Sequence, residues 1–187
     1  MRRPTIIALC LLAIAGAAHA GDVPPEKTAV ILTRALSYDQ LLSSRAGGAI
    51  VIAVLYKNGD PGAQALADAM YAAFKRLDHV RVQGLPISTV KLPFDGAARL
   101  RAQIVAQGID LLFVCEGLSK ELAQIIQVTR VTHVLSASAV LEDVRDGASI
   151  GVFLEGAQSS ITINLAACRD EGAAFSAELL RLAKILR

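Results

Sequence analysis

Short apolar runs alternate along the chain with segments whose apolar residues recur every three or four positions. Ala49–Leu55 is almost wholly apolar and rich in β-branched residues, and Leu111–Cys115 is a second run of this kind. Runs of this length, bounded by turn residues, predict strands that are covered on both faces of a sheet. The other predicted strands in this part of the chain are Val80–Val82 with Ile87–Leu92, as one irregular region, and Thr132–Leu135.

The segments between these runs predict helices. Asp60-Pro61 is a typical helix start, because the carboxylate can cap free N–H groups and proline suits the first helical position. Gln107-Gly108 is a typical helix end, because glycine readily adopts the left-handed conformation of a C-cap. The predicted helices run from Glu26 to Leu42, from Asp60-Pro61 to about Leu77, from Asp95 to Gln107, from the capping residue Ser119 through Ile126, and from about Ser176 to Leu186.

The alternation of strands and helices predicts a parallel sheet with right-handed crossovers. The C-terminal third differs, because Ile150–Leu154 and Ile161–Leu165 flank a short turn segment and the second run alternates between apolar and polar residues. This pattern predicts an antiparallel hairpin with a half-buried strand. The predicted fold class is α/β, with one three-layer domain over residues 21–187. It has a mainly parallel sheet, helices on both faces, a C-terminal antiparallel hairpin and a closing helix.

The first 20 residues predict export. Arg2 and Arg3 precede the apolar run Ile6–Ile14, and Ala18-His19-Ala20 follows, which is the order of regions in a secretory signal peptide cleaved after Ala20. Hydrophobic residues make up 53% of the chain, above the roughly 45–50% of soluble domains, and this segment accounts for much of the excess. The mature chain is therefore predicted to be periplasmic.

Charge and hydropathy exclude two classes of function. Removal of residues 1–20 takes away two of the 19 basic residues, so the mature chain balances its 17 acidic residues and is close to neutral. A nucleic-acid-binding domain needs a basic stripe along the sequence, and none is present. No later segment has the roughly 18 uncharged apolar residues that a membrane span requires.

Two cysteines remain after the signal peptide, Cys115 and Cys168. In an oxidising compartment an even number permits one disulfide. A bond requires the two Cα atoms to lie about 4.4–6.8 Å apart, which a sequence does not show. The alternative is that both are buried as small apolar residues, because each follows closely on an apolar run.

The sequence lacks the patterns of common catalytic sites. It has no G-x-S-x-G elbow, no P-loop and no G-x-G-x-x-G after a strand. His79 and His133 share no short spacing and no metal-ligand pattern, so exposed or capping roles are favoured for both. We therefore expect no enzymatic activity, no metal and no cofactor.

Two acidic clusters favour solvated loop faces over the paired carboxylates of a hydrolase. Both lie in glycine-containing loops, and basic residues stand among them. The clusters are Glu142-Asp143 with Asp146, near Arg145, and Asp170-Glu171, next to Arg169.

A binding function fits the predicted sheet better, because ligands of open parallel sheets bind beyond the carboxyl ends of the strands. Polar residues gather at these ends, and ordinary loop roles are the alternative. Arg145 and Asn164 are further contact candidates, although Asn164 could also cap the turn over 166–169. The strand-end candidates are Tyr56, Lys57, Asn58, Glu116, Ser119, Ser136 and Ser138.

Four segments of the last third carry recognisable motifs in order: Val134–Ser138 as a strand end, residues 147–153, the I-T-I-N-L-A-A segment at 161–167, and a leucine-rich helix at 175–184. Together they resemble the YfiR-like periplasmic family. The resemblance implies an exported α/β regulator without catalytic activity. The best-known members bind the periplasmic part of an inner-membrane diguanylate cyclase and keep it inactive, which links them to cyclic di-GMP and biofilm control. They are also associated with homodimers and redox-sensitive disulfides.

The sequence departs from the family pattern at two places. Ala35–Leu42 has only Tyr38 as an aromatic residue, where family members carry an F-x-K-F-V-E-W-P-like stretch. Ala139 follows Ser138, where the family has an acidic residue. The fold therefore carries over better than the specific partner.

These observations predict an exported, non-enzymatic regulatory protein that binds the periplasmic domain of a membrane signalling protein. The alternative is a periplasmic small-ligand-binding protein that serves a transporter or a sensor kinase. The strand-end residues would form the ligand site in that case.

Overall fold

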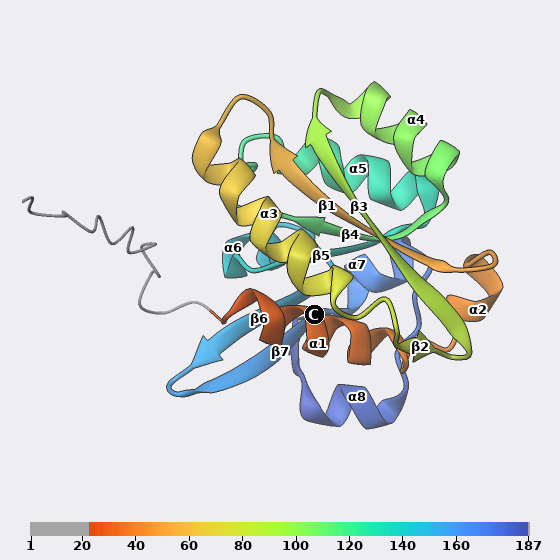
Figure 1. The fold of residues 1–187 in the computed structure, drawn as a ribbon. Coiled ribbons are helices and arrows are strands. Elements are labelled where there is room, and N and C mark those ends of the chain that lie inside the picture. The colour runs from red at the N-terminus through yellow and green to blue at the C-terminus, as the bar shows by residue number, and fades with distance from the viewer. Residues whose placement is uncertain (1–22, 187) are drawn as a thin grey trace, which may run out of the picture.

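The computed structural model describes residues 23–186 (Figure 1). Their strands form one eight-stranded sheet in the order β2-β3-β1-β4-β5-β6-β7-β8. Pairing is parallel from β3 through β1, β4 and β5 to β6, whereas β2 and β7 run antiparallel to β3 and β6, and β8 is parallel to β7. The strands are β1 (Ile50–Lys57), β2 (Arg81–Val82), β3 (Leu85–Phe94), β4 (Ile109–Val114), β5 (Leu135–Ser138), β6 (Ile150–Glu155), β7 (Gln158–Asn164) and β8 (Lys184–Leu186).

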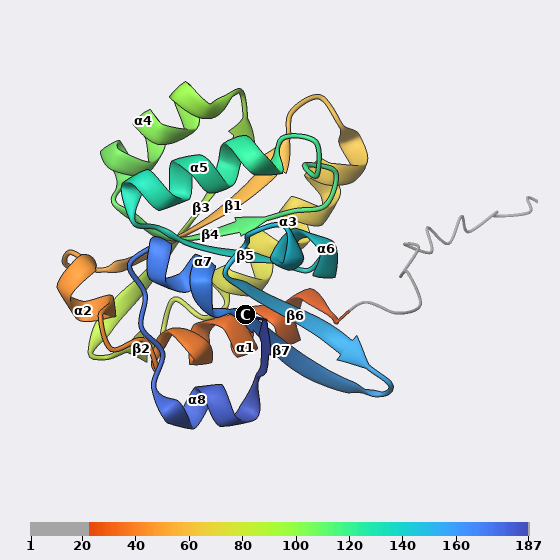
Figure 2. The same ribbon diagram turned by 180° about the vertical axis from the view of Figure 1, so that it is seen from behind.

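Helices cover both faces of the sheet and complete three layers. Helices α1 and α3 pack together on one face, and α4 and α5 pack together on the other (Figures 1 and 2). The helices are α1 (Pro25–Leu36), α2 (Leu42–Arg45), α3 (Pro61–Lys75), α4 (Ala97–Gln107), α5 (Leu122–Thr132), α6 (Leu141–Arg145), α7 (Leu165–Asp170) and α8 (Ala177–Leu182). Among residues 23–186, no helix has both the length and the apolar character needed to cross a bilayer. The predicted signal peptide and its cleavage site lie outside the described residues.

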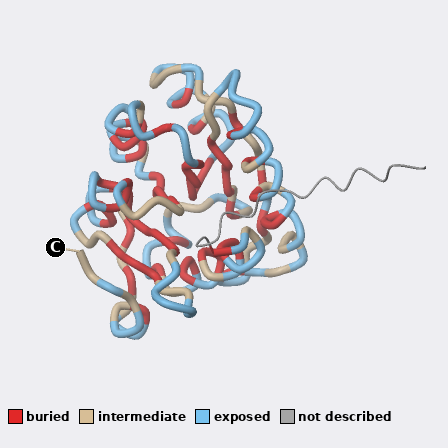
Figure 3. The backbone as a smooth tube through the Cα atoms, turned by 90° about the vertical axis from the view of Figure 1, so that its left-hand side faces the viewer, coloured by how far each residue is buried: buried red, intermediate tan, exposed pale blue. Residues whose placement is uncertain are grey.

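The core has two parts, one on each side of the sheet. Successive side chains of a strand point to opposite faces, so Val54 of β1 joins the cluster beside α1 and α3, whereas Leu55 joins the cluster beneath α4 and α5. Phe74 of α3 meets Phe113 of β4 edge to face, with ring centroids 6.2 Å apart. Buried residues line the strands and the inner sides of the helices (Figure 3). The apolar runs are therefore strands buried on both faces, as the sequence predicted.

The predicted α/β class is confirmed, and so are its main local signals. The Asp60 carboxylate accepts hydrogen bonds from the N–H groups of Gly62 and Ala63, at 2.9 and 3.1 Å, and caps α3. Gly108 ends α4 in the left-handed conformation, with a φ of 61°. The predicted C-terminal hairpin is β6 and β7.

The first helix is shorter than predicted. It ends at Leu36 instead of continuing to Leu42, and the next five residues turn toward the C-terminal segment. The Gln40 N–H donates to the Ala174 carbonyl at 2.8 Å, and the Ser176 N–H donates to the Tyr38 carbonyl at 3.0 Å. The helix ends early because its next backbone groups bind a distant part of the chain.

Other predicted boundaries were also wrong, because long-range pairing decided them. The predicted strand at Thr132–Leu135 begins only at Leu135, since α5 continues through Thr132. The predicted irregular strand is instead the antiparallel pair β2 and β3. The closing helix stops at Leu182, and the following residues form β8, which pairs with backbone groups of β7.

Two predicted helix caps were wrong as well. Helix α5 begins at Leu122, after Glu121, so Ser119 lies outside it and is exposed. Helix α4 begins after Gly96, and the Asp95 carboxylate instead contacts other side chains.

A buried ion pair holds the turn after α1 against the C-terminal segment. Asp39 is fully buried, and its carboxylate accepts hydrogen bonds from Arg45 and from the N–H groups of Leu41 and Ala174. The Arg45 guanidinium also donates to the backbone carbonyls of His133, at 3.3 Å, and Glu171, at 3.4 Å. One charged pair therefore joins the end of α1, the end of α5 and the segment after α7.

Replacing Arg45 with methionine should lower the free energy of unfolding by about 3 kcal/mol, because the buried Asp39 carboxylate would lose its cationic partner. Urea denaturation at neutral pH measures this change. Arg99→Met is the control, because the ion pair of Arg99 with Asp95 is largely exposed, and pairs of that kind contribute less than about 1 kcal/mol. Equal losses for the two variants would contradict a structural role for the buried pair.

Gly151 of β6 lies where no side chain fits. A Cβ atom there would come within 2.1 Å of the Phe153 ring and 2.7 Å of a Val144 methyl group. Gly151→Ala should therefore destabilise the protein by about 1–3 kcal/mol in urea denaturation, because β6 and α6 would have to separate. The control Gly48→Ala adds a methyl group in open space, and stability there should stay unchanged or rise by up to about 1 kcal/mol.

Candidate functional site

The predicted strand-end residues do not gather at one site. Lys57 lies 3.7 Å from the Glu121 carboxylate, and the Asn58 amide donates to Asp95 at 2.6 Å. The Tyr56 ring is half-buried, with the Lys91 ammonium 5.3 Å from its centroid. These candidates are therefore paired with neighbouring side chains along the carboxyl edge of the sheet. Glu116 and Ser119 are exposed at the same edge.

Ser138 and Asp143 form a buried pair at the carboxyl end of β5. The Ser138 hydroxyl donates to the Asp143 carboxylate at 2.7 Å and accepts from the Val140 N–H at 3.1 Å. Asp143 is buried, which raises the pKa of its carboxyl group. The prediction of a solvated loop face is therefore wrong for Asp143. It holds for exposed Glu142, which pairs with exposed Arg145 at 3.3 Å.

Asn164 has the capping role that was one of its two predicted alternatives. Its side-chain oxygen accepts from the Ala167 N–H at 3.1 Å, and its amide donates to the Val144 carbonyl at 3.0 Å. Asn164 therefore starts α7 and ties β7 to α6.

Glu171 is the second exception to the solvated-loop prediction. Its side chain is fully buried between α5 and the sheet. The carboxyl group is within hydrogen-bond distance of the hydroxyls of Thr129, at 2.5 Å, Ser136, at 2.8 Å, and Ser149, at 2.5 Å, and it accepts from the Ser136 N–H at 2.7 Å. Ser136 therefore points to a buried acid and is itself fully buried, so it is not accessible at the carboxyl edge. No cationic side chain is among these contacts.

Burial raises the pKa of Glu171, and its hydrogen bonds to Ser149, Thr129 and Ser136 only partly oppose that shift. The cluster accommodates both protonation states. When Glu171 is ionised, the three hydroxyls and the backbone N–H all donate to it. When Glu171 is protonated, it can donate to the Thr129 hydroxyl, which in turn donates to the Ile126 carbonyl 3.0 Å away.

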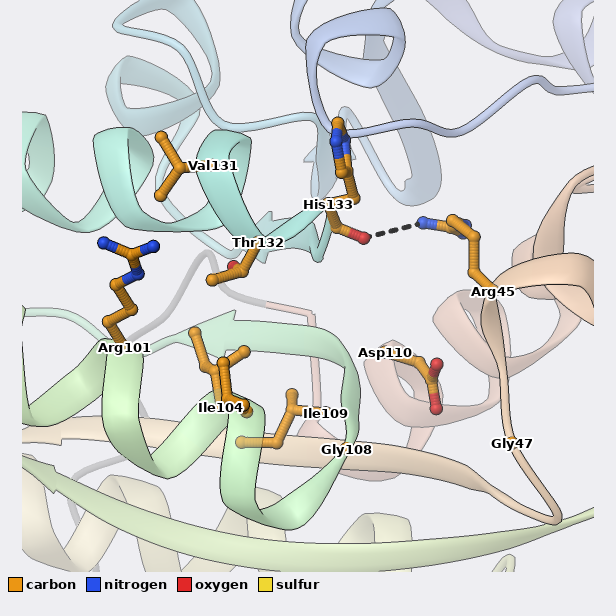
Figure 4. Close-up of a pocket in the computed structure, with 11 residues that line it drawn as sticks. Arg45, Gly47, Arg101, Ile104, Gly108, Ile109, Asp110, Val131, Thr132 and His133 are labelled. Atoms are coloured by element: carbon orange, nitrogen blue, oxygen red, sulfur yellow. Dashed lines mark hydrogen bonds between the residues drawn. The ribbon is translucent and has the colours of Figure 1, made fainter.

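A cavity of about 400 Å³ lies at the amino edge of the sheet, opposite the predicted site. It is a trough between the C-terminal ends of α4 and α5, closed at one end by Arg45 (Figure 4). We call it the amino-edge trough. Its lining residues are Arg45, Gly47, Arg101, Ile104, Val105, Gly108, Ile109, Asp110, Val131, Thr132 and His133.

Charged groups stand at both ends of the amino-edge trough. Arg101 lies at the end next to Val131, and Asp110 lies at the other end near Arg45 (Figure 4). Asp110 is buried and accepts from the Val51 N–H at 2.8 Å. Burial raises the pKa of its carboxyl group, although this hydrogen bond and the positive charge of Arg45 oppose that shift.

His133 ends α5 in the left-handed conformation, with a φ of 53°. It was predicted to open a strand, which is wrong, but its predicted exposed or capping role is confirmed, because it is an exposed C-cap. His79 is also exposed. No group of three or more His, Cys, Asp or Glu side chains within residues 23–186 is arranged to bind a metal.

Cys115 and Cys168 are both buried and free, so the structure has the second of the two predicted alternatives. Cys115 follows β4 at the carboxyl edge, whereas the Cys168 thiol contacts the Ser149 carbonyl, at 3.6 Å, beside the amino end of β6. Burial raises the pKa of each thiol to about 12.

Glu171→Gln should remove a component of the pH dependence of stability. The pKa of Glu171 is raised above its ordinary value of 4.5 in the folded protein. The folded chain therefore keeps a proton that the unfolded chain has lost, and stability contributed by Glu171 is largest below pH 4.5 and decreases as the pH rises toward the folded-state pKa. Glutamine mimics the protonated acid, since its amide can donate to Thr129.

Urea denaturation of both proteins from pH 4 to pH 8 measures this effect. The stability of the wild type relative to Glu171→Gln should fall with pH above 4.5, by at most about 1.4 kcal/mol per pH unit for one proton. A difference that does not change with pH would show that Glu171 has the same pKa in both states. Asp110 and Asp143 remain in both proteins, so their titration cancels.

Solved structures with a similar fold include a conserved domain protein from Vibrio cholerae, with a TM-score of 0.62 and 14% identity, covering 89% of this chain and 61% of that one. The ABC domain from Streptococcus pneumoniae, in complex with L-Trp, has a TM-score of 0.60 and 10% identity, covering 87% and 60%. A ligand-free, open substrate-binding protein with adhesive properties from Clostridium difficile has a TM-score of 0.53 and 13% identity, covering 79% and 58%.

The chain therefore spans about three fifths of the length of these proteins. Identities this low indicate a shared fold alone. No curated protein gives a significant match.

The family comparison covers nearly all of the described chain. The YfiR/HmsC-like family model matches residues 28–184, from the first turn of α1 to the start of β8. The motifs of the last third lie within this match, and so do the buried Glu171 cluster and the amino-edge trough. The chain belongs to the YfiR/HmsC-like family.

Proposed function

We propose that this protein is an exported regulator that binds the periplasmic domain of an inner-membrane signalling protein and holds it inactive. A diguanylate cyclase is the expected partner, and cyclic di-GMP and biofilm formation are the expected outputs. The observation that carries the proposal is the YfiR/HmsC-like family match over residues 28–184. The signal-peptide pattern of residues 1–20 supports the periplasmic location.

Exposed apolar side chains also support a role in protein binding. Val105 and Val131 have 70% and 57% of their surface exposed. Large apolar side chains with this exposure are typical of the centre of a protein interface when they lie close together. Val105 and Val131 both line the amino-edge trough.

Small-ligand binding is the second candidate. The amino-edge trough has a volume of about 400 Å³, within the range of pockets for small molecules, and it combines apolar walls with Arg101, Asp110 and His133. A ligand site there would lie at the edge opposite the predicted strand-end site.

Deletion of the gene should raise the cellular cyclic di-GMP concentration, because an inhibited cyclase would become active. The tagged mature protein should also recover a membrane-bound cyclase or sensor from detergent-solubilised membranes. Mass spectrometry of the captured proteins and quantification of cyclic di-GMP measure the two effects. Capture of no signalling protein, together with unchanged cyclic di-GMP, would contradict the regulator.

Calorimetry against a metabolite panel tests the second candidate. Binding that is lost in Arg101→Gln and kept in Arg99→Gln would favour a ligand site in the trough, because Arg99 is absent from its lining. A panel without any binding, beside positive capture of a signalling protein, would favour the regulator.

A further inference from the structure

The paired outer surfaces of α4 and α5 differ in charge from the helices on the other face of the sheet. α4 and α5 together carry Arg99, Arg101 and Arg130 and no acidic residue. By contrast, α1 and α3 include Glu26 and Asp68 among their basic residues. The two helices therefore contribute only positive charge to this face, and the acids beside it come from neighbouring segments.

Each of the two helices presents one stripe of exposed residues along its length. Helical spacing places the members of a stripe on one side of each helix. Both stripes consist of small or uncharged residues, an arginine and a terminal valine. The stripes are Ala98, Arg101, Ala102 and Val105 on α4, and Ala123, Gln127, Arg130 and Val131 on α5.

The surface between the stripes is hollowed. The amino-edge trough lies on one side of Val131, and a second cavity of about 330 Å³ lies on its other side, lined by Ala123, Ile126, Gln127, Arg130, Val131 and Asp146. Val131 therefore separates two adjoining depressions along α5. Val131 and Arg101 both line the trough, and Figure 4 shows them at the end away from Arg45 and Asp110.

The arginines of this face differ in how they are paired. Arg99 lies 3.3 Å from Asp95, and Arg130 lies 3.4 Å from Asp170. Arg101 has no ion pair among residues 23–186, although it lines the trough. Besides Asp95 and Asp170, the acids that face this surface include Asp110, which is buried and lines the trough, and Asp146, which lines the second cavity. The trough end at Arg101 therefore offers a cation that lacks a partner.

We propose that the α4–α5 surface is the docking site for the signalling partner, and that the partner contributes an acidic amphipathic helix. Its apolar side would lie on Val105, Val131 and the alanines, whose small side chains permit close approach of a second backbone. A carboxylate of that helix would reach Arg101, which has no ion pair among residues 23–186. A helix in a groove between two helices is a common mode of recognition, and complementary charge sets its orientation. The inference rests on the proposed function, since it names the surface and the partner chemistry of that regulator.

Binding between the mature protein and the purified periplasmic domain of the captured membrane protein tests the inference. Arg101→Glu and Val131→Glu should each weaken the affinity about tenfold or more, because like charges or a buried carboxylate at an interface cost several kcal/mol. The matched controls are Arg99→Glu, two residues along α4 and off the stripe, and Leu182→Glu, at an exposed apolar position on α8. Both controls should bind within about threefold of the wild type, as energetically neutral surface positions do.

The four substituted side chains are exposed, and unchanged thermal melting would verify that the variants fold. Binding that is equal in wild type, Arg101→Glu and Val131→Glu would overturn the surface while leaving the regulator in place. Loss of binding in Leu182→Glu alone would place the interface on α8 and overturn the inference as well. If the wild type captures no membrane signalling protein, the proposed function fails, and the docking surface fails with it.

Affinity that decreases with added salt in the wild type, and much less in Arg101→Gln, would support a carboxylate partner, because exposed charge pairs are screened by salt. A salt dependence that is the same in both proteins would contradict the role assigned to Arg101.

Discussion

The buried ion pair between Asp39 and Arg45 is the interaction on which the amino edge of this protein depends. Asp39 lies on the turn after α1, and its carboxylate also accepts from the Ala174 backbone. Arg45 binds the carbonyls at the end of α5 and after α7. A single charged pair thus fixes three segments that are distant in the sequence. It also positions the Arg45 side chain at the end of the amino-edge trough.

Buried acids are a second constraint on the fold. Asp110, Asp143 and Glu171 are all buried, and burial raises the pKa of each. Within residues 23–186, the Glu171 carboxyl group has no cationic partner among its hydrogen bonds and depends on hydroxyl and N–H groups from α5, from β5 and from Ser149, which precedes β6. Its cluster joins the C-terminal segment to the sheet by hydrogen bonds whose pattern changes with one proton. The free energy of unfolding therefore depends on the protonation of Glu171, which lies where elements from both core clusters meet.

The surface properties fit a protein that works by contact with another macromolecule. At the carboxyl edge, Tyr56, Lys57 and Asn58 contact neighbouring side chains. The α4–α5 surface carries exposed valines and one arginine, Arg101, that has no ion pair within residues 23–186. The fold is shared with substrate-binding proteins, yet its trough lies at the amino edge of the strands, opposite the usual ligand position in open parallel sheets.

Local patterns in the sequence determined the elements that depend on neighbouring residues. Runs such as Ala49–Leu55 favour buried strands, Asp60-Pro61 can cap a helix with atoms three residues away, and Gly108 can end a helix without strain. The alternation of Ile161–Leu165 identified the hairpin, and the motifs of the last third identified the family. These features need only the chain's own local geometry, and so the sequence alone was sufficient for the α/β class.

Only the tertiary structure decided the features that depend on distant partners. Backbone hydrogen bonds to Ala174 and Ser176 set the end of α1. Residues 184–186 form a strand because their backbone groups pair with β7. The sequence predicts Glu171 to be a solvated loop residue, because it follows the acidic Asp170. In the structure it is buried, because the hydroxyls of Thr129, Ser136 and Ser149 supply hydrogen bonds to its carboxyl group. No sequence motif predicts the trough, because its walls come from α2, α4, β4 and α5, which are separate segments of the chain. A pattern along the chain reports short-range geometry, whereas a buried charge or a cavity depends on what the folded chain brings next to it.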